Sequence, residues 1–326
     1  MTSISYSDTI PQIVTELCNC SSMLRIGMVG MNCGCEYTSF PMFKNLEPYS
    51  RLEHSLGVAR IIWKHTGDIT QTVAGLLHDI SSPAFAHVID FVRGDYMKQE
   101  STEDRTAEII CSDRDICEIL SRYGIHVEAV TDYHVYPIAD NDAPKLSADR
   151  LEYTLGNMVN YGFASLATAQ KLYDDIIAGA NEFGEPELVF RSEECAVEFA
   201  WLSLECSEIY CGDADRYSMQ ILSEIIRDAV DDKVLDITDL YRDEPSVIGK
   251  LCSDEKYSAL WRRYRSLSEI FYPDSDIPES RRIDAKRRCI DPFAVGRGRV
   301  SGVCPEYKSA LDEFLSRDLS YRIAGR

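Results

Sequence analysis

Four residues in the N-terminal half of the sequence have side chains and spacing that suit a metal site. They are His54, the adjacent pair His78 and Asp79, and Asp149. Imidazole nitrogens and carboxylate oxygens are ligands that hard and borderline divalent cations accept. Neighbouring residues on a helix point in different directions, so His78 and Asp79 can reach one ion only where their helix ends. The pattern therefore predicts one divalent ion whose ligands come from several separate helices.

Helices are the elements expected to position these residues. Apolar residues recur three to four positions apart from Ser50 onward, and again over 69–79 and 148–161, which is the period of an amphipathic helix. Ser81, Ser82 and Pro83 predict that the helix over 69–79 ends at the His-Asp pair. Further helices are expected over residues 1–24, 101–122 (with a capping-box start at Ser101 and Asp104), 166–180, 193–210, 213–231, 237–251, 255–271 and 306–319, with 187–190 short and extended.

Three sequence phrases carry a resemblance to a known family. They are RLEHSLGV over residues 51–58, GLLHDI over 75–80 and SADRLEY over 147–153. In this order and with these flanks they resemble the HD-domain metal-dependent phosphohydrolases, and within that family the deoxynucleoside triphosphate triphosphohydrolases (the dGTPase-like branch). The resemblance covers residues 20–160 well and continues weakly into KRRCIDP over 286–292.

The expected fold class is all-α, because strand-like alternation is scarce along the sequence. Residues 1–165 are expected to form an HD-type catalytic helical core. Residues 166–326 are expected to form a helical C-terminal extension packed on the core, with a basic loop near 281–299. The resemblance implies one divalent metal ion, which the sequence does not identify among Mn, Fe, Mg, Zn, Co and Ni. Oligomers are common in the resembling family, so a homo-oligomer is compatible with the helical C-terminal half.

The resemblance also implies roles for residues beside the four ligands. His87 matches a general acid or water-orienting group, and Asp90, three residues later, matches the carboxylate that holds it. Arg51 matches a position that contacts substrate phosphate, and Tyr153 matches one near the sugar. Lys145 is a weaker candidate for phosphate binding. For each of these residues an ordinary structural role stays open, such as a helix pair, a surface salt bridge or core packing.

Three places depart from the family pattern. Ser81-Ser82 stands where the triphosphohydrolases have Gly-His, Gln99-Glu100 stands for a His-Glu pair, and Gly156-Asn157 stands for Arg-Asp. These differences bear on triphosphate specificity more than on the metal site. His134 leaves a dinuclear centre open as an alternative, which would need two well-placed extra histidines.

The charge of the chain restricts its partners. The net charge is −20 and the sequence pI is near 4.7. Such an acidic surface repels phosphate backbones and argues against general nucleic-acid binding. An anionic substrate would need a locally basic pocket, for which there are two candidates. One is Arg51 with Lys145 and Arg150, and the other is the basic run over 281–299.

The sequence contains neither a signal peptide pattern at its start nor an apolar run long enough to span a bilayer. A cytoplasmic protein without membrane partners is therefore expected. Twelve cysteines include two Cys-x-Cys pairs, Cys18/Cys20 and Cys33/Cys35. Their spacing differs from that of structural zinc sites, which favours reduced, buried thiols over a second metal site or a redox pair.

The hypothesis that these observations favour is a metal-dependent phosphohydrolase acting on a nucleotide substrate. Its reaction would be that of a dNTP triphosphohydrolase or of a nucleotide phosphatase. Two alternatives stay open. One is a dinuclear HD phosphodiesterase or oxygenase, and the other is a non-catalytic module that senses nucleotides.

Overall fold

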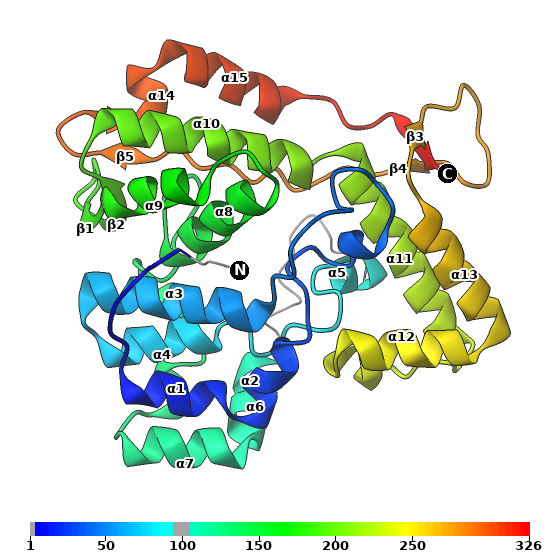
Figure 1. Ribbon diagram of the computed structural model, residues 1–326, viewed down its shortest axis with the longest axis horizontal. Helices are drawn as coiled ribbons and strands as arrows, with labels where there is room; N and C mark the ends of the chain where they lie inside the picture. Colours follow the sequence, from blue (N-terminus) through cyan, green and yellow to red (C-terminus); the bar gives the residue numbers. More distant parts are fainter. Residues whose placement is uncertain (1–3, 94–104) are drawn as a thin grey trace.

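The computed structural model describes residues 4–93 and 105–326, and most of them are helical (Figure 1). The predicted capping box at Ser101 and Asp104 and the pair Gln99-Glu100 lie outside the described residues. The helices in chain order are α1 Gln12–Cys18, α2 Ser21–Ile26, η1 Cys35–Tyr37, α3 Arg51–Thr66, α4 Ile69–Leu77, α5 Val88–Arg93, α6 Thr106–Ser112, α7 Arg114–Arg122, η2 Val127–Ala129, η3 Tyr133–Val135, α8 Ala148–Asn160, α9 Leu166–Asp174, α10 Glu193–Tyr210, α11 Asp213–Asp231, η4 Ile237–Tyr241, α12 Glu244–Ser253, α13 Glu255–Ser266, α14 Val300–Val303 and α15 Pro305–Ser316.

Short strands make the all-α prediction only approximately correct. The strands of the described chain are β1 Ile176–Ala180, β2 Pro186–Phe190, β3 Ile270–Phe271, β4 Arg281–Arg282, β5 Phe293–Ala294, β6 Gly298–Arg299 and β7 Arg322–Gly325. They form a four-stranded sheet in the order β1-β2-β5-β6 and a three-stranded sheet in the order β3-β7-β4. The helix predicted over 166–180 is wrong beyond Asp174, because β1 pairs antiparallel with β2 instead.

Local signals place the helices around the predicted ligands. Ser50 caps α3 through a capping box with Glu53, in which Ser50 N donates to Glu53 Oε2 at 2.8 Å. Gly67 ends that helix at φ +63°, in the left-handed region. Asp68 caps α4 by accepting from the amides of Thr70 and Gln71, and α4 ends with His78 as its C-cap. The predicted position of the His-Asp pair at a helix end is therefore confirmed.

Close helix packing brings α3 against α4 and α8. A Cβ atom at Gly75 would lie 2.2 Å from Ile62 Cδ1, and one at Gly57 would lie 2.4 Å from Glu152 Oε1. Glycine at these two positions therefore permits α4 and α8 to approach α3 as closely as they do. The result is that the three elements carrying the predicted ligands meet.

The described residues have two groups of buried apolar side chains. The first lies among α1, α3, α4, α7, α8, α9, α10 and α15, and the second lies among α5, α11, α12 and α13. Both groups contain residues from either side of residue 165. Among the described helices, none combines the length and apolar character of a bilayer-spanning segment.

The chain between β4 and β5 crosses the molecule from one small sheet to the other (Figure 1). β4 pairs with β7 at one end, and Ala294 of β5 pairs with Phe190 of β2 at the other. Residues 283–292 are thus anchored at both ends by sheet pairing. This segment contains much of the basic run predicted as a loop near 281–299.

Candidate metal centre

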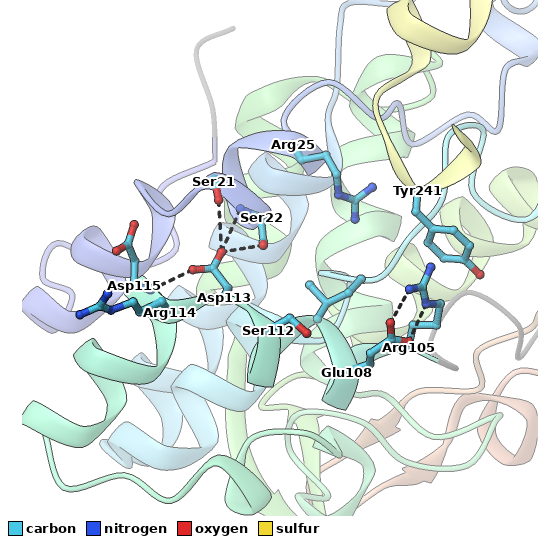
Figure 2. A pocket seen from close by; sticks show the side chains of 11 residues that line it. Ser21, Ser22, Arg25, Arg105, Glu108, Ser112, Asp113, Arg114, Asp115 and Tyr241 are labelled. Carbon is cyan, nitrogen blue, oxygen red and sulfur yellow. Dashed lines mark hydrogen bonds and ion pairs between the residues drawn. The ribbon is translucent and has the colours of Figure 1, made fainter. Parts of the chain in front are cut away.

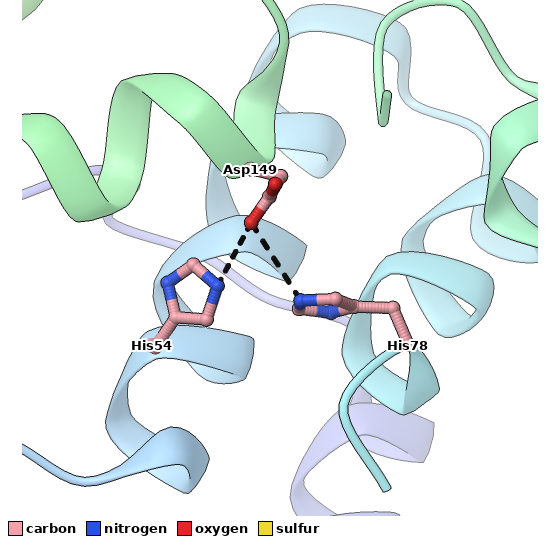
Figure 3. Close-up of side chains that lie close together, drawn as sticks. All are labelled: His54, His78 and Asp149. Atoms are coloured by element: carbon pink, nitrogen blue, oxygen red, sulfur yellow. Dashed lines mark hydrogen bonds and ion pairs between the residues drawn. The ribbon is translucent and has the colours of Figure 1, made fainter. Parts of the chain in front are cut away.

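Three of the four predicted ligands form a compact cluster. Selected ligand atoms of His54, His78 and Asp149 lie within 4.8 Å of one another (Figure 3). Asp149 Oδ1 is 3.0 Å from His54 Nε2 and 3.7 Å from His78 Nε2. The three residues come from α3, the end of α4 and the first turn of α8. Two imidazoles and a carboxylate from separate helices thus converge, as the spacing predicted.

The far nitrogen of each ring has its own hydrogen-bond partner. His54 Nδ1 lies 2.5 Å from Glu152 Oε2, and His78 Nδ1 lies 2.7 Å from the Gly75 carbonyl oxygen. An acceptor at Nδ1 keeps a proton there, so Nε2 is the nitrogen that can give up its proton and bind a cation. The donor set and its supporting contacts therefore fit a divalent ion.

Asp79, the fourth predicted ligand, faces the cluster but is shared with Arg51. Its Oδ2 is 3.6 Å from His78 Nε2 and 4.0 Å from His54 Nε2. Arg51 Nη1 contacts both Asp79 oxygens, at 2.7 and 2.8 Å, and Ser82 Oγ donates to Oδ1 at 2.8 Å. The guanidinium therefore orients the carboxylate, and Arg51 Nε is left buried without a partner among the described residues.

Electrostatics of the metal-free cluster follow from this arrangement. Burial disfavours the charged ring of His54, but hydrogen bonds with Asp149 and Glu152 outweigh it and raise its pKa to about 10. Burial also opposes ionisation of Asp149, but the hydrogen bond and charge of His54 lower its pKa to about 2. For Asp79, the Arg51 charge overcomes burial and lowers the pKa well below its usual range. The carboxylates are thus ready to receive a cation.

His87 and Asp90 form the predicted pair next to the cluster. His87 Nδ1 lies 3.0 Å from Asp90 Oδ2, and the Asp90 side chain is fully buried. Arg288 Nη2 lies 3.3 Å from His87 Nε2. Burial lowers the pKa of His87 to about 4, although the hydrogen bond that its ring donates to Asp90 opposes this shift. The ring is therefore neutral at pH 7, which supports the water-orienting role over the general-acid role.

The cluster lies in the wall of a cavity of about 720 Å³. The wall includes the four predicted ligands together with Arg51, His87 and Tyr153. Lys145 is the predicted residue that the structure does not bring there, because its Nζ lies 3.1 Å from Glu185 Oε2, away from the described walls of the cavity. Asp90 sits behind His87, and the binding roles of Arg51 and Tyr153 stay predictions.

Sequence reasoning missed two residues of the site. Arg288 reaches His87 from a segment about 200 positions away, and the basic composition near 281–299 was the only signal of it. Glu152 follows Asp149 by three residues in the helix predicted over 148–161, but its contact with His54 was not predicted. Lys286 and Arg287 also line the cavity from the segment between β4 and β5.

A second hollow of about 460 Å³ lies among α2, α6 and α7 (Figure 2). Several of its charged groups have protein partners. Ser22 Oγ donates to Asp113 Oδ2 at 2.6 Å, and Arg105 Nε donates to Glu108 Oε2 at 2.8 Å. Arg25 donates to backbone carbonyls, including that of Ser82 at 2.8 Å. This hollow therefore contributes to the structure around the His-Asp turn.

Comparison with known proteins adds family-level information. No protein-family model matches the chain. The chain is 28% identical over 249 residues to an uncharacterized protein, YdhJ, of Bacillus subtilis, covering 74% of this chain and 73% of the relative. It is 31% identical over 129 residues to a metal-dependent phosphohydrolase, cns2, of Cordyceps militaris, covering 40% of this chain and 37% of that relative. The partial likeness to the second relative supports an HD-domain-like family and a general metal-dependent phosphohydrolase function.

Proposed function

We propose that this protein is a metal-dependent phosphohydrolase that acts on nucleotides and holds one divalent cation with His54, His78, Asp79 and Asp149. The observation that carries the proposal is the convergence of two ring Nε2 atoms and Asp149 Oδ1 in the wall of a large cavity with cationic side chains. When bound there, a divalent cation supplies Lewis acidity that polarises a phosphoryl oxygen and lowers the pKa of water.

The side chains around the cluster divide the remaining tasks. Arg288 and the Nε of Arg51, which has no hydrogen-bond partner among the described residues, provide donors for phosphate oxygens, which guanidinium groups bind well. Once phosphate engages Arg288, His87 Nε2 is free to accept a hydrogen bond from the attacking water, while Asp90 keeps the ring oriented through Nδ1. The water oxygen bonds to phosphorus as the bond to the leaving group breaks. The water proton passes by way of His87 to solvent, and the leaving oxygen takes a proton from water.

Two features support release of a single phosphate over release of triphosphate. Lys145 pairs with Glu185, and Arg150 Nη1 pairs with Asp140 Oδ1 at 3.1 Å. These two cations near Asp149 are thus already neutralised, which leaves less positive charge for a chain of three phosphates. A nucleotide phosphatase is therefore the preferred form of the proposal, with dNTP triphosphohydrolase as the other.

The test is a screen of ribo- and deoxyribonucleotide mono- and triphosphates with Mn²⁺, Fe²⁺, Co²⁺, Mg²⁺, Zn²⁺ and Ni²⁺, with products identified by mass. We expect hydrolysis of at least one substrate, and its loss in His78→Ala. The control Lys145→Ala changes a nearby cation outside the cavity walls and should keep activity. Absence of turnover on every substrate with every metal would overturn the proposal.

A further inference from the structure

The cavity extends beyond the metal cluster along α8. Asp149, Tyr153 and Asn157 follow at four-residue intervals, and all three line it. Side chains four apart lie on the same face of a helix, and eight residues of helix rise about 12 Å. One wall therefore runs from the cluster to a second polar region around Asn157, beyond the reach of a phosphate held by the metal ligands.

Asp215, in the first turn of α11, lines the same cavity. Within the described part of the chain, its carboxylate makes neither a hydrogen bond nor an ion pair. Its neighbour Asp213 provides a contrast, because Asp213 Oδ1 pairs with Arg216 Nη2 at 2.6 Å and accepts from Tyr321 at 2.8 Å. Burial raises the pKa of Asp215 to about 8, opposed by the charge of Arg288. The negative charge of Asp215 also contributes, after burial, to the raised pKa of Tyr161 at the end of α8.

Asn157 has an unused acceptor in the same region. The residue is only 6% exposed, and its Oδ1 is buried without a hydrogen-bond partner among the described residues. Its Nδ2 donates to Tyr210 Oη at 2.7 Å, which orients the amide. A buried polar atom without a partner costs about 1–3 kcal/mol. Asn157 and Asp215 therefore present two acceptors whose partners the described chain does not supply.

We infer that Asp215, assisted by Asn157, forms a specificity subsite that binds an N–H or O–H donor on the organic group of the substrate. The inference rests on the proposed phosphohydrolase function and names the class of ester that this function acts on. A donor at this position would restore the hydrogen bonding that the carboxylate loses on burial. A second phosphate or carboxylate there would oppose ionisation of Asp215, whereas a neutral donor favours it. The favoured substrate is thus a phosphate ester with a neutral, donor-bearing group such as an amino-substituted nucleobase.

An acid in the first turn of a helix also interacts favourably with the helix dipole. That role predicts that neutralising Asp215 lowers stability. A binding role predicts the reverse, since replacing a carboxyl that lacks a partner among the described residues keeps or raises the thermal midpoint. Thermal unfolding of Asp215→Asn, which preserves the shape of the side chain, therefore separates the two explanations.

The decisive experiment measures binding of nucleoside monophosphates by calorimetry in the presence of a chelator, so that hydrolysis does not enter. Guanosine and inosine monophosphates differ by one exocyclic amine, as do adenosine and purine riboside monophosphates. The adenosine and deoxyadenosine pair differs by one hydroxyl. For wild type we expect at least one pair in which the donor-bearing member binds about tenfold or more tightly, the range of a hydrogen bond to a charged group. In Asp215→Ala that ratio should fall to near one.

The matched control is Asp142→Ala, which removes another carboxylate from the cavity wall at an exposed position and should keep the wild-type ratio. The same ratios in wild type and Asp215→Ala would overturn the inference, as would a loss of stability in Asp215→Asn. Hydrolysis of 4-nitrophenyl phosphate with Mn²⁺ tests the proposed function separately. If wild type binds donor-bearing nucleotides more tightly but hydrolyses no substrate, the subsite is upheld and the proposed phosphohydrolase function is refuted.

Discussion

Glu152 provides a sensitive test of how the metal ligands are positioned. Its Oε2 lies 2.5 Å from His54 Nδ1, and Tyr49 Oη donates to the same oxygen. A hydrogen bond to an ionised carboxylate is stronger than one between neutral groups and raises the basicity of the ring. Glu152→Gln keeps the size of the side chain while removing its charge. The change therefore acts on His54 without opening a cavity.

The expected effect is on metal affinity. Loss of such a partner typically weakens binding about 10- to 100-fold, which corresponds to about 1.4–2.7 kcal/mol. The loss of metal affinity in Glu152→Gln should be near tenfold, because the amide oxygen can still accept from His54 Nδ1–H. The loss of metal affinity in Glu152→Ala should be near 100-fold, since this change leaves both the His54 ring N–H and the Tyr49 hydroxyl without their acceptor.

The assay is competition for Mn²⁺ against a fluorescent chelator, with thermal unfolding recorded for each variant. Glu187→Gln is the matched control, because Glu187 is another fully buried carboxylate but pairs with Arg299 at 2.6 Å. It should lower stability and leave the Mn²⁺ dissociation constant unchanged. A folded Glu152→Gln protein with wild-type Mn²⁺ affinity would refute the argument that Glu152 orients His54.

Three further predictions concern protons and substrate. His54 is protonated below its pKa of about 10 in the metal-free protein. Metal binding at pH 7 should therefore release a proton, and metal affinity should rise about tenfold per pH unit as pH rises toward that value. Calorimetry in buffers of different ionisation enthalpy measures the proton release, and a binding enthalpy that does not depend on the buffer would contradict it. His87→Ala should lower kcat about 10²- to 10⁴-fold with Mn²⁺ affinity retained, so unchanged kcat would remove His87 from the reaction. Arg288→Ala should raise KM about tenfold or more. Arg288→Lys should restore KM only in part, because lysine lacks the planar guanidinium that binds phosphate with two hydrogen bonds. Equal KM values for Arg288→Ala and wild type would exclude contact between Arg288 and the phosphate.

The helix ends that carry the candidate ligands could be predicted from the sequence because their signals are local. The breaker after the His-Asp pair ends α4 at the correct place, and the apolar period from Ser50 onward matches α3, which begins at Arg51. The apolar period over 148–161 places Asp149 in the first turn of α8. Each of these features depends on a few neighbouring residues, so no knowledge of tertiary contacts was needed.

The errors arose where distant contacts decide the structure. Residues 176–180 are compatible with a helix by composition, but pairing with β2 makes them a strand. The helix predicted over 101–122 is interrupted at Asp113, which caps α7 and is held by Ser22 of α2, whose Oγ donates to Asp113 Oδ2 at 2.6 Å. Lys145 lies close to Asp149 in sequence, yet Glu185 from the turn before β2 holds it elsewhere.

Arg51 and Arg288 illustrate the same limit within the site. A sequence cannot show that Arg51 contacts both oxygens of Asp79, because the two residues are 28 positions apart. Nor can it show that Arg288 lies beside His87, since that contact depends on sheet pairing at both ends of the segment 283–292. Composition indicated a basic segment, and only the fold indicated its target.

The most direct test of the account is anomalous diffraction from crystals of the purified protein grown with Mn²⁺. We expect a single strong peak within bonding distance of His54 Nε2, His78 Nε2 and Asp149 Oδ1, with an oxygen of Asp79 as the fourth ligand, and loss of that peak in His54→Ala. Crystals with these side chains well ordered and no anomalous density between them would contradict the metal centre and the hydrolase built on it.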